Sequence, residues 1–366
     1  MIILLLYGLY ISIIYTTVFN DVKYNAFVHA LWIIAILALH STSILALLLS
    51  VTRNRNHLRN VLTIISFVDS KLLHKHCKQS VYMHQRSHIV WQLIVEFILY
   101  GIPSAFSWIL FYDGTWTCLV YLVSDTIATV TNAVVILQYV SIVLIVKRRY
   151  QYIRHLLSEA AFTDDFCTST HMYAGHPVSH DSDKLFLSER YKVKNGRGSR
   201  NMYRIHDLQI IYSELYDVLH ANSKTYGILI LLNIMAILTI TVPTTYLGVV
   251  FLTGAVFNTD KTDVYFRGIC FFCQSSSGLL TFLWLTICCH STADEVKDTI
   301  VCIQKLLLRP NRLFWSTEDL KRLLSQLKNL KVEFSVCGLF SLNLQLLSGS
   351  VGVIITYILV LNQFNY

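Results

Sequence analysis

Two acidic side chains, Glu96 and Asp125, lie well inside long apolar stretches of the chain. A charge within an apolar membrane segment costs a few kcal/mol, so such residues tend to be paired or functional. Asp125 lies toward the predicted outer end of its stretch, within reach of a pocket that would open to the outside of the membrane. We interpret it as a ligand contact. Glu96 lies nearer the opposite end of its segment, and we interpret it as a structural group. For each residue, the alternative is a packing hydrogen bond to a neighbouring hydroxyl.

Aromatic and polar side chains also gather toward the predicted outer halves of several apolar stretches. An aromatic-lined pocket with a few hydrogen-bonding groups suits a small, partly apolar ligand. The alternative is that Trp and Tyr collect at membrane interfaces for their amphipathic character alone. The candidate ligand-binding residues are, besides Asp125, Trp32, Trp108, Tyr121, Tyr246 and Gln274.

No residue pattern indicates catalysis, a metal site or a cofactor. The sequence contains no glycine-rich phosphate loop, no G-x-S-x-G and no H-E-x-x-H. The histidines between residues 74 and 88 match no compact zinc spacing, and nearby lysines would oppose a cation. We interpret that segment as a basic surface near anionic lipid headgroups. An enzyme is therefore not expected.

Composition indicates an all-α polytopic membrane protein. Hydrophobic residues make up 54% of the 366 residues and charged residues 14%, against about 25% charged in a soluble domain. The apolar runs are continuous, as in transmembrane helices, and do not alternate as in a β-barrel. Seven transmembrane helices are predicted, at Met1–Phe19, Ala26–Val51, Ile89–Tyr112, Trp116–Val146, Tyr226–Leu252, Val264–His290 and Val336–Phe364.

The basic residues predict the orientation. Loops 52–88, 147–224 and 291–337 hold 7, 12 and 8 of the 30 Lys and Arg residues, that is 27 in total. The positive-inside rule therefore places these loops in the cytoplasm, the amino terminus inside and the carboxyl terminus outside. The net charge of +8 follows from this asymmetry and does not indicate nucleic-acid binding.

The loops are expected to be partly ordered. Helical periodicity predicts that the fourth and fifth helices extend into 147–224, around a mobile loop at 163–201. Ser316-x-x-Asp319 predicts a helix start in 291–337. The predicted regions are thus 1–146 with helices one to four and loop 52–88, 147–224 with helix extensions, 225–290 with helices five and six, an anchor region at 291–337, and helix seven at 338–364.

Cys118 and Cys270 could pair, or could be ordinary small membrane residues.

The last apolar stretch is longer than a membrane requires. As one helix, its 29 residues would span roughly 43 Å, against a bilayer core of about 30 Å. Small residues at 348–352 predict a bend that separates an anchor half, 336–348, from a second half, 351–364. Helical spacing places Thr356, Val360 and Gln363 on one stripe, and Tyr357, Val360, Leu361 and Phe364 on an adjacent one.

The chain ends in Thr356-Tyr357, five intervening residues, then Gln363-Phe364. This pattern, at the end of seven helices with an inside amino terminus, resembles the signature of insect gustatory receptors. Asn362 departs from it, since an apolar residue usually fills that position. Ile358 stands where receptors for common sugars tend to carry an acidic residue, so the resemblance favours bitter-type, fructose-type or orphan members.

The resemblance implies a non-selective cation channel opened by a small tastant, in the plasma membrane of chemosensory neurons. It also implies a homo- or hetero-tetramer whose seventh helices line one central pore, with Gln363 and Phe364 at the gate. Thr356, Tyr357 and Val360 would line the pore, where a hydrophobic ring can close a channel by dewetting. The alternative for this stripe is ordinary helix packing. The alternative functions are a G-protein-coupled receptor, which the orientation opposes, and a membrane transporter.

Overall fold

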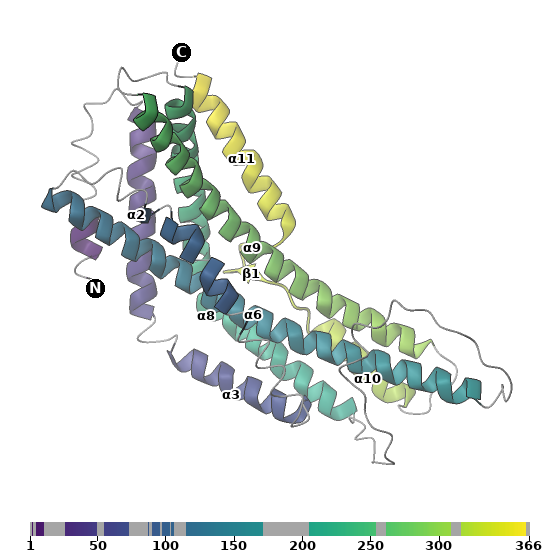
Figure 1. Cartoon of the computed structure of the whole chain (residues 1–366). Helices are drawn as coiled ribbons and strands as arrows, with labels where there is room; N and C mark the ends of the chain where they lie inside the picture. The colour runs from purple at the N-terminus through teal and green to yellow at the C-terminus, as the bar shows by residue number, and fades with distance from the viewer. Residues whose placement is uncertain are drawn as a thin grey trace. The chain divides into compact units, whose positions relative to one another are not determined.

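The computed structural model describes residues 2, 5–10, 26–49, 55–72, 87, 90–95, 97–102, 104–105, 115–170, 205–253, 261–308 and 316–363. Nearly all of them are helical (Figure 1). The longer helices are α2 (Ala26–Leu49), α3 (Arg55–Leu72), α6 (Trp116–Thr170), α8 (Ile205–Thr253), α9 (Lys261–Leu307), α10 (Thr317–Asn329) and α11 (Leu344–Gln363). A π-helical turn, η3, covers Phe97–Gly101, and a hairpin pairs β1 (Ser335–Val336) with β2 (Phe340–Ser341).

Several helices are long and apolar enough to cross a membrane. In the described part of the chain, four meet this criterion: Cys118–Ser158, Ile205–Thr253, Val264–Leu307 and Leu344–Leu361. Helix α2 adds a shorter apolar segment, Ile33–Leu49. The predicted all-α membrane architecture is therefore confirmed. The first predicted span falls largely outside the described residues, and in the third the structure describes residues 90–95, 97–102 and 104–105.

The chain forms two compact units. Unit 1 comprises Met1–Arg148, Glu214–Glu295 and Val332–Tyr366, and unit 2 comprises Arg149–Ser213 and Val296–Lys331. Helices α6, α8 and α9 each contribute a segment to both units, and all three continue beyond the apolar runs predicted for them.

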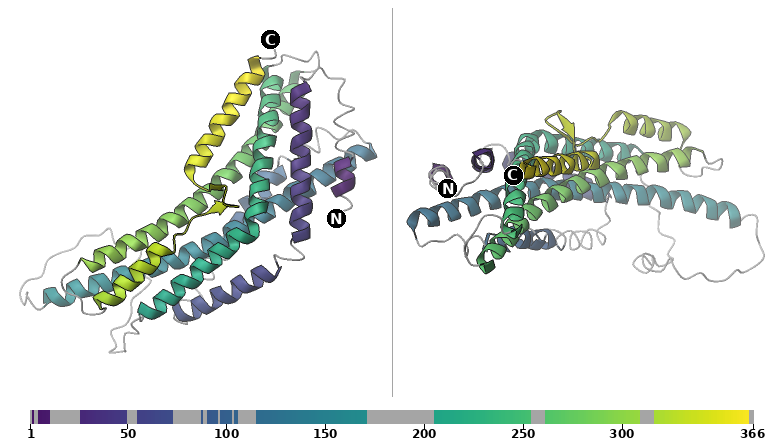
Figure 2. Two further views of the ribbon diagram at one scale, coloured as in Figure 1. Left: turned by 180° about the vertical axis from the view of Figure 1, so that it is seen from behind. Right: turned by 90° about the horizontal axis from the view of Figure 1, so that it is seen from above.

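Unit 2 is a small helical bundle built from α10 and the ends of α6, α8 and α9 (Figure 2). The rings of Tyr150 and Tyr212 meet edge to face at 5.3 Å, and the Tyr212 hydroxyl donates to the Leu330 carbonyl at 3.5 Å. Arg154 Nη1 lies 2.8 Å from Asp298 Oδ2. This half-exposed ion pair adds little stability, so the bundle depends mainly on its buried rings and leucines.

Helix α10 begins where the sequence predicts. Ser316 is its N-cap, and its Oγ accepts a hydrogen bond from the Asp319 backbone N–H at 3.1 Å. An N-cap hydroxyl satisfies one of the four unpaired N–H groups at a helix start, and it contributes about 1 kcal/mol. Leu320, Leu323 and Leu327 recur at helical spacing and are buried, which fixes the face that α10 presents to unit 2.

In unit 1, a ladder of polar contacts joins α2 to α6. His40 Nε2 lies 3.2 Å from Ser124 Oγ, and Ser43 Oγ donates to the Ala128 carbonyl at 2.9 Å. One turn further along α6, Asn132 Nδ2 donates to the Leu39 carbonyl at 3.2 Å. Such interhelical hydrogen bonds are suited to an apolar environment, where the hydrophobic effect does not drive helix association.

Gly8 allows the amino-terminal segment to approach the same position of α6. A Cβ atom at Gly8 would overlap Ser124 Oγ and Cβ. We therefore expect Gly8→Ala to destabilise the fold by about 1–3 kcal/mol, because overpacking forces the two backbones apart. Thermal unfolding followed by fluorescence-detected size exclusion measures this. Gly349→Ala is the matched control, since a Cβ there meets nothing within 4 Å. Equal melting temperatures for both variants would contradict the packing at Gly8.

The cytoplasmic loop predicted at 52–88 contains a helix that the sequence analysis missed. Helix α3 occupies Arg55–Leu72 and buries Val61, Ile65, Val68 and Leu72, which recur at spacings of four, three and four residues. This periodicity was present in the sequence but was obscured by the basic and polar residues between these positions. Within the predicted mobile loop, residues 163–170 belong to α6, and 171–201 lie outside the described residues.

Two further expectations concern the third helix and the cysteines. Within the third predicted helix, Phe97–Gly101 is π-helical; we expect the sequence Gly101-Ile102-Pro103 to kink this helix, and Pro103 lies outside the described residues. A π-turn is a recognised cause of helix kinks. Cys118 and Cys270 are buried and are not joined by a disulfide, so the possible bond between them is not formed.

The predicted continuous helix over Val336–Phe364 is wrong at its start. Residues 335–341 form the β1–β2 hairpin, and helix α11 begins at Leu344. Cys337 and Gly338 have φ values of 51° and 74°, so the backbone reverses there and cannot remain helical. Gly338 and Asn343 were the available sequence signals, because Asn343 Oδ1 caps α11 by accepting from the Leu346 N–H at 3.0 Å.

Candidate functional site

Helix α11 is the least covered of the long apolar helices. Only 17% of its most apolar window is buried inside the chain, against 56%, 56% and 44% for the other three. Its 20 residues give a length of about 30 Å, which matches the hydrocarbon core of a bilayer. The excess length that the sequence predicted is therefore absent, because the hairpin takes up the first residues of the apolar run.

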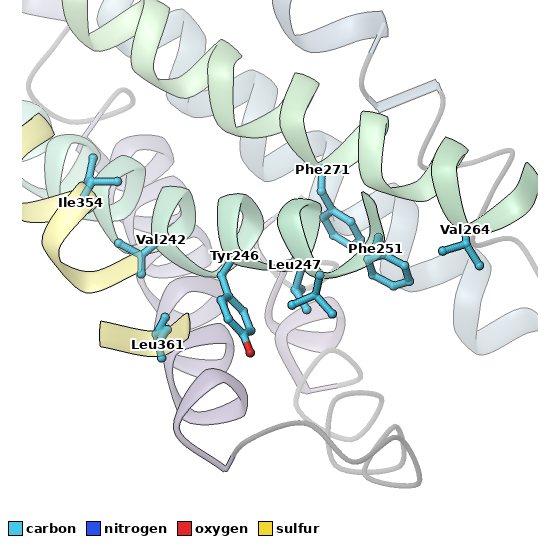
Figure 3. Close-up of a cluster of buried hydrophobic side chains, with 9 residues drawn as sticks. Val242, Tyr246, Leu247, Phe251, Val264, Phe271, Ile354 and Leu361 are labelled. Atoms are coloured by element: carbon cyan, nitrogen blue, oxygen red, sulfur yellow. The ribbon is translucent and has the colours of Figure 1, made fainter. Parts of the chain in front are cut away.

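One stripe of α11 holds it against the rest of unit 1. Ile354 and Leu361 are 5% and 2% exposed, and Ile358 packs beside them. They join a cluster of apolar side chains from α8 and α9 (Figure 3), formed by Val242, Tyr246, Leu247, Val250, Phe251, Val264 and Phe271. Leu361 is thus a packing residue. Its predicted place on a pore-facing stripe is wrong, because that stripe was drawn from spacing without knowing which face is packed.

The opposite face of α11 is mostly small and polar, with Leu359, which is 58% exposed, as an apolar member. Residues on this face recur at spacings of four, three, four and seven, and each is exposed: Gln345, Gly349, Gly352, Thr356 and Gln363. At about 100° per residue, these positions lie on the far side of the helix from Ile354 and Leu361. A Cβ at Gly349 or Gly352 would meet nothing within 4 Å, so neither glycine serves packing inside this chain.

The predicted pore residues divide around this face. Thr356 and Gln363 lie on it, Val360 borders it with 39% exposure, and Tyr357 lies on the flank between the open and packed faces. Phe364 lies outside the described residues, as does the side chain of Asn362. The helix is continuous from Leu344 to Gln363, so the small residues 348–352 do not interrupt it. The Ser350 and Thr356 hydroxyls are satisfied within the helix, because each donates to the carbonyl oxygen four residues earlier, of Leu346 and Gly352.

The hairpin positions the start of α11 against α8. A Cβ built on Gly227 would come within 3.5 Å of both the backbone N and the Sγ of Cys337. The Leu339 N–H donates to the Val336 carbonyl at 3.0 Å, and the Leu342 N–H donates to the Phe334 carbonyl at 2.7 Å. The beginning of α11 is therefore fixed by backbone hydrogen bonds as well as by side-chain packing.

The candidate ligand residues form two pairs. Tyr121 and Asp125 are one turn apart on α6, and both are half-buried. The second pair, Tyr246 on α8 and Gln274 on α9, are the chain neighbours of Thr245 and Ser275, whose hydroxyls hydrogen-bond at 2.5 Å. Trp108 and Glu96 lie outside the described residues, and the same holds for the Trp32 side chain.

Asp125 and Tyr246 differ in their surroundings. Ser124, the chain neighbour of Asp125, is engaged by His40, whereas the Asp125 carboxylate makes no hydrogen bond or ion pair with any described residue. A carboxyl group within an apolar span is costly when it has no partner. Tyr246, in contrast, is 3% exposed and belongs to the apolar cluster that holds α11. Tyr246 is therefore both a candidate ligand residue and a member of the cluster that packs against Ile354 and Leu361 of α11.

Sequence reasoning missed the polar residues that organise these pairs. His40 stands in an otherwise apolar helix, and its type alone could have marked it as an interhelical contact. Thr245 and Ser275 gave no such signal, because hydroxyl residues are frequent throughout these helices. Among the described residues, no three His, Cys, Asp or Glu side chains cluster in a way that could hold a metal ion.

Comparison with known proteins establishes the family. Residues 1–366 match the family described as 7tm Chemosensory receptor. The chain belongs to this family of seven-transmembrane chemosensory receptors. It is therefore a multi-pass membrane receptor and not an enzyme. No curated protein matches the sequence.

Solved structures show the same receptor fold. The insect olfactory receptor OR5 from Machilis hrabei aligns with a TM-score of 0.60 and 12% identity, over 99% of this chain and 87% of that one. The same olfactory receptor in complex with eugenol aligns with a TM-score of 0.57 and 10% identity, over 98% and 88% of the two chains. At these identities, the similarity shows a shared fold.

Proposed function

We propose that this chemosensory receptor is a gustatory receptor that acts as a ligand-gated, non-selective cation channel. Four subunits, of this chain alone or with related receptors, would surround one pore lined by α11. The observation that carries the proposal is the open face of α11, formed by Gln345, Gly349, Gly352, Thr356 and Gln363. A membrane helix with a packed apolar stripe and a small, polar opposite face is suited to line a water-filled pore.

The gate is proposed at the end of this face. Val360 follows Thr356 by one turn, so four copies would form an apolar ring next to a hydroxyl ring. An apolar constriction excludes water when narrow and admits it when the helices separate. Gln363, together with Phe364 and Tyr357, would surround the exit of the pore.

The ligand is proposed to be a small tastant of the bitter, fructose or orphan type. Tyr121, Asp125, Tyr246 and Gln274 provide aromatic rings and hydrogen-bonding groups, and Trp32 and Trp108 remain proposed members of the same pocket. The related olfactory receptor binds eugenol, a small and partly apolar molecule, which supports this class of ligand. Tyr246 and Leu361 belong to one apolar cluster, which offers a route from the ligand to the pore helix.

The orientation is part of the proposal. The excess of Lys and Arg in the long loops supports an amino terminus inside and a carboxyl terminus outside. The receptor is proposed to act in the plasma membrane of chemosensory neurons. One experiment tests both orientation and function: cells expressing the chain with a carboxyl-terminal epitope are stained without permeabilisation and then screened with tastants for calcium influx. Surface staining with ligand-evoked current is expected. Staining only after permeabilisation would favour a G-protein-coupled receptor, and ligand uptake without current would favour a transporter.

A further inference from the structure

Helix α3 carries an exposed stripe in addition to its packed face. Val61, Ile65, Val68 and Leu72 are buried within unit 1. Directly beside them lie Leu58 and Leu62, one turn apart, which are 36% and 55% exposed. Arg55 and Arg59 border the leucines on the side away from the core, and both are exposed. The stripe therefore combines two uncovered apolar side chains with two cationic ones.

The position of α3 places this stripe next to the membrane. Helix α2 consists of 24 residues without a charged side chain, and residues 50–54 separate it from α3. Figures 1 and 2 show α3 leaving the end of α2 at a wide angle instead of continuing its direction. An amphipathic helix that turns aside at the end of a membrane span lies in the interfacial region.

The two arginines have no partner of their own within the described part of the chain. Neither guanidinium makes a hydrogen bond or ion pair there. They follow one another at i and i+4, so their positive charges add on the same face. A guanidinium presents a planar set of donors that matches phosphate and carboxylate oxygens.

We propose that α3 is a membrane-surface helix that binds anionic phospholipid. Leu58 and Leu62 enter the boundary between headgroups and acyl chains, while Arg55 and Arg59 bind the phosphate and carboxylate groups of headgroups such as phosphatidylserine. The leaflet assignment rests on the proposed orientation, because anionic lipids concentrate on the cytoplasmic side. The lipid-binding chemistry of the stripe does not depend on the ligand or on channel activity.

Bound lipid would be connected to the membrane-spanning helices through His57. The His57 ring, on α3, meets the Tyr226 ring of α8 edge to face at 6.0 Å. Tyr226 in turn meets Tyr139 of α6 at 6.2 Å, and its hydroxyl donates to Gln138 Oε1 at 3.3 Å. A lipid that holds α3 at the surface therefore also restrains α6 and α8 at the level of this aromatic cluster.

The test is a lipid titration of the full-length receptor in neutral detergent. Phosphatidylserine or phosphatidylcholine is added in mixed micelles, and bound lipid is counted by native mass spectrometry. The double variant R55Q/R59Q is expected to bind phosphatidylserine about 25-fold more weakly, because each basic side chain near an anionic surface contributes roughly fivefold. L62S is expected to weaken it several-fold, and phosphatidylcholine binding should change little.

Two control variants lie on the same helix but off the stripe. Phe67 is 42% exposed and about 140° around the helix from Leu62, and Lys71 lies about 120° from Arg59. F67S and K71Q are therefore expected to bind phosphatidylserine as the wild type does. Hydrogen exchange of the α3 peptide confirms that each variant keeps the helix.

Several outcomes would overturn the proposal. One is that R55Q/R59Q binds phosphatidylserine with the same affinity as the wild type. Another is that K71Q loses as much phosphatidylserine affinity as R55Q/R59Q does. A third is that L62S changes the number of subunits in the particle without changing lipid binding, which would make the stripe a contact between copies of the chain. None of these measurements uses a tastant or a current, so failure of the channel proposal would be recognised separately.

Discussion

Replacing Thr356 by leucine is expected to reduce ligand-evoked current roughly tenfold. Thr356 lies at the centre of the open face of α11, so four leucines would place an apolar ring in the proposed lumen next to Val360. An added barrier of about 1.4 kcal/mol to water and ions is sufficient for this loss. Whole-cell recording measures it, normalised to surface staining.

The control for this prediction is Ile355→Leu. Ile355 is 52% exposed but lies on the lateral face of α11, about 100° from Thr356. Its current should remain near the wild-type level. If Thr356→Leu also retains full current, or if both variants lose it equally, α11 does not line the pore through this face. Unchanged currents in Gln363→Ala and Phe364→Ala would contradict the proposed gate.

Asp125→Asn is expected to raise the ligand concentration for half-maximal current at least tenfold. The change removes the negative charge at nearly constant volume, at a carboxylate that no described residue binds. Loss of a charge-assisted hydrogen bond to the ligand costs about 1.5–3 kcal/mol, which corresponds to a factor of ten or more. Surface expression should be equal or higher, because a neutral side chain is less costly inside a membrane.

The matched control is Asp217→Asn, which changes an exposed carboxylate on α8 in the same way. Its dose–response curve should coincide with that of the wild type. A normal curve for Asp125→Asn would identify Asp125 as a packing residue. Reduced expression of Asp125→Asn with an unchanged curve would support the same conclusion.

The sequence predicted the long helices well because their signals are strong and local. Continuous apolar runs and helical periodicity located α6, α8 and α9, and Ser316 with Asp319 located the start of α10. It failed where apolar residues adopt another conformation. Val336 and Phe340 read as helix by hydropathy, whereas two positive-φ residues between them make a hairpin.

The candidate site was predictable only in part. Thr356 and Gln363 could be selected from the terminal pattern, but which face of α11 is open depends on the packing of Ile354 and Leu361. That packing is set by partners on α8 and α9 more than 80 residues earlier in the sequence, and periodicity alone does not reveal them. The same holds for Thr245 and Ser275, whose contact requires knowledge of which helices are neighbours.

The hairpin before α11 gives this part of the chain a constraint on length. The hairpin holds Cys337 next to Gly227 of α8, just before α11 begins. The number of helical residues that follow therefore determines the direction in which each later side chain of α11 points. One inserted residue would rotate the remainder of α11 by about 100° and turn Thr356 and Gln363 away from their face, while Leu361 would leave its cluster. A substitution within the helical residues 344–355 changes local contacts only. An insertion or deletion there would change the rotational register of every later residue of α11.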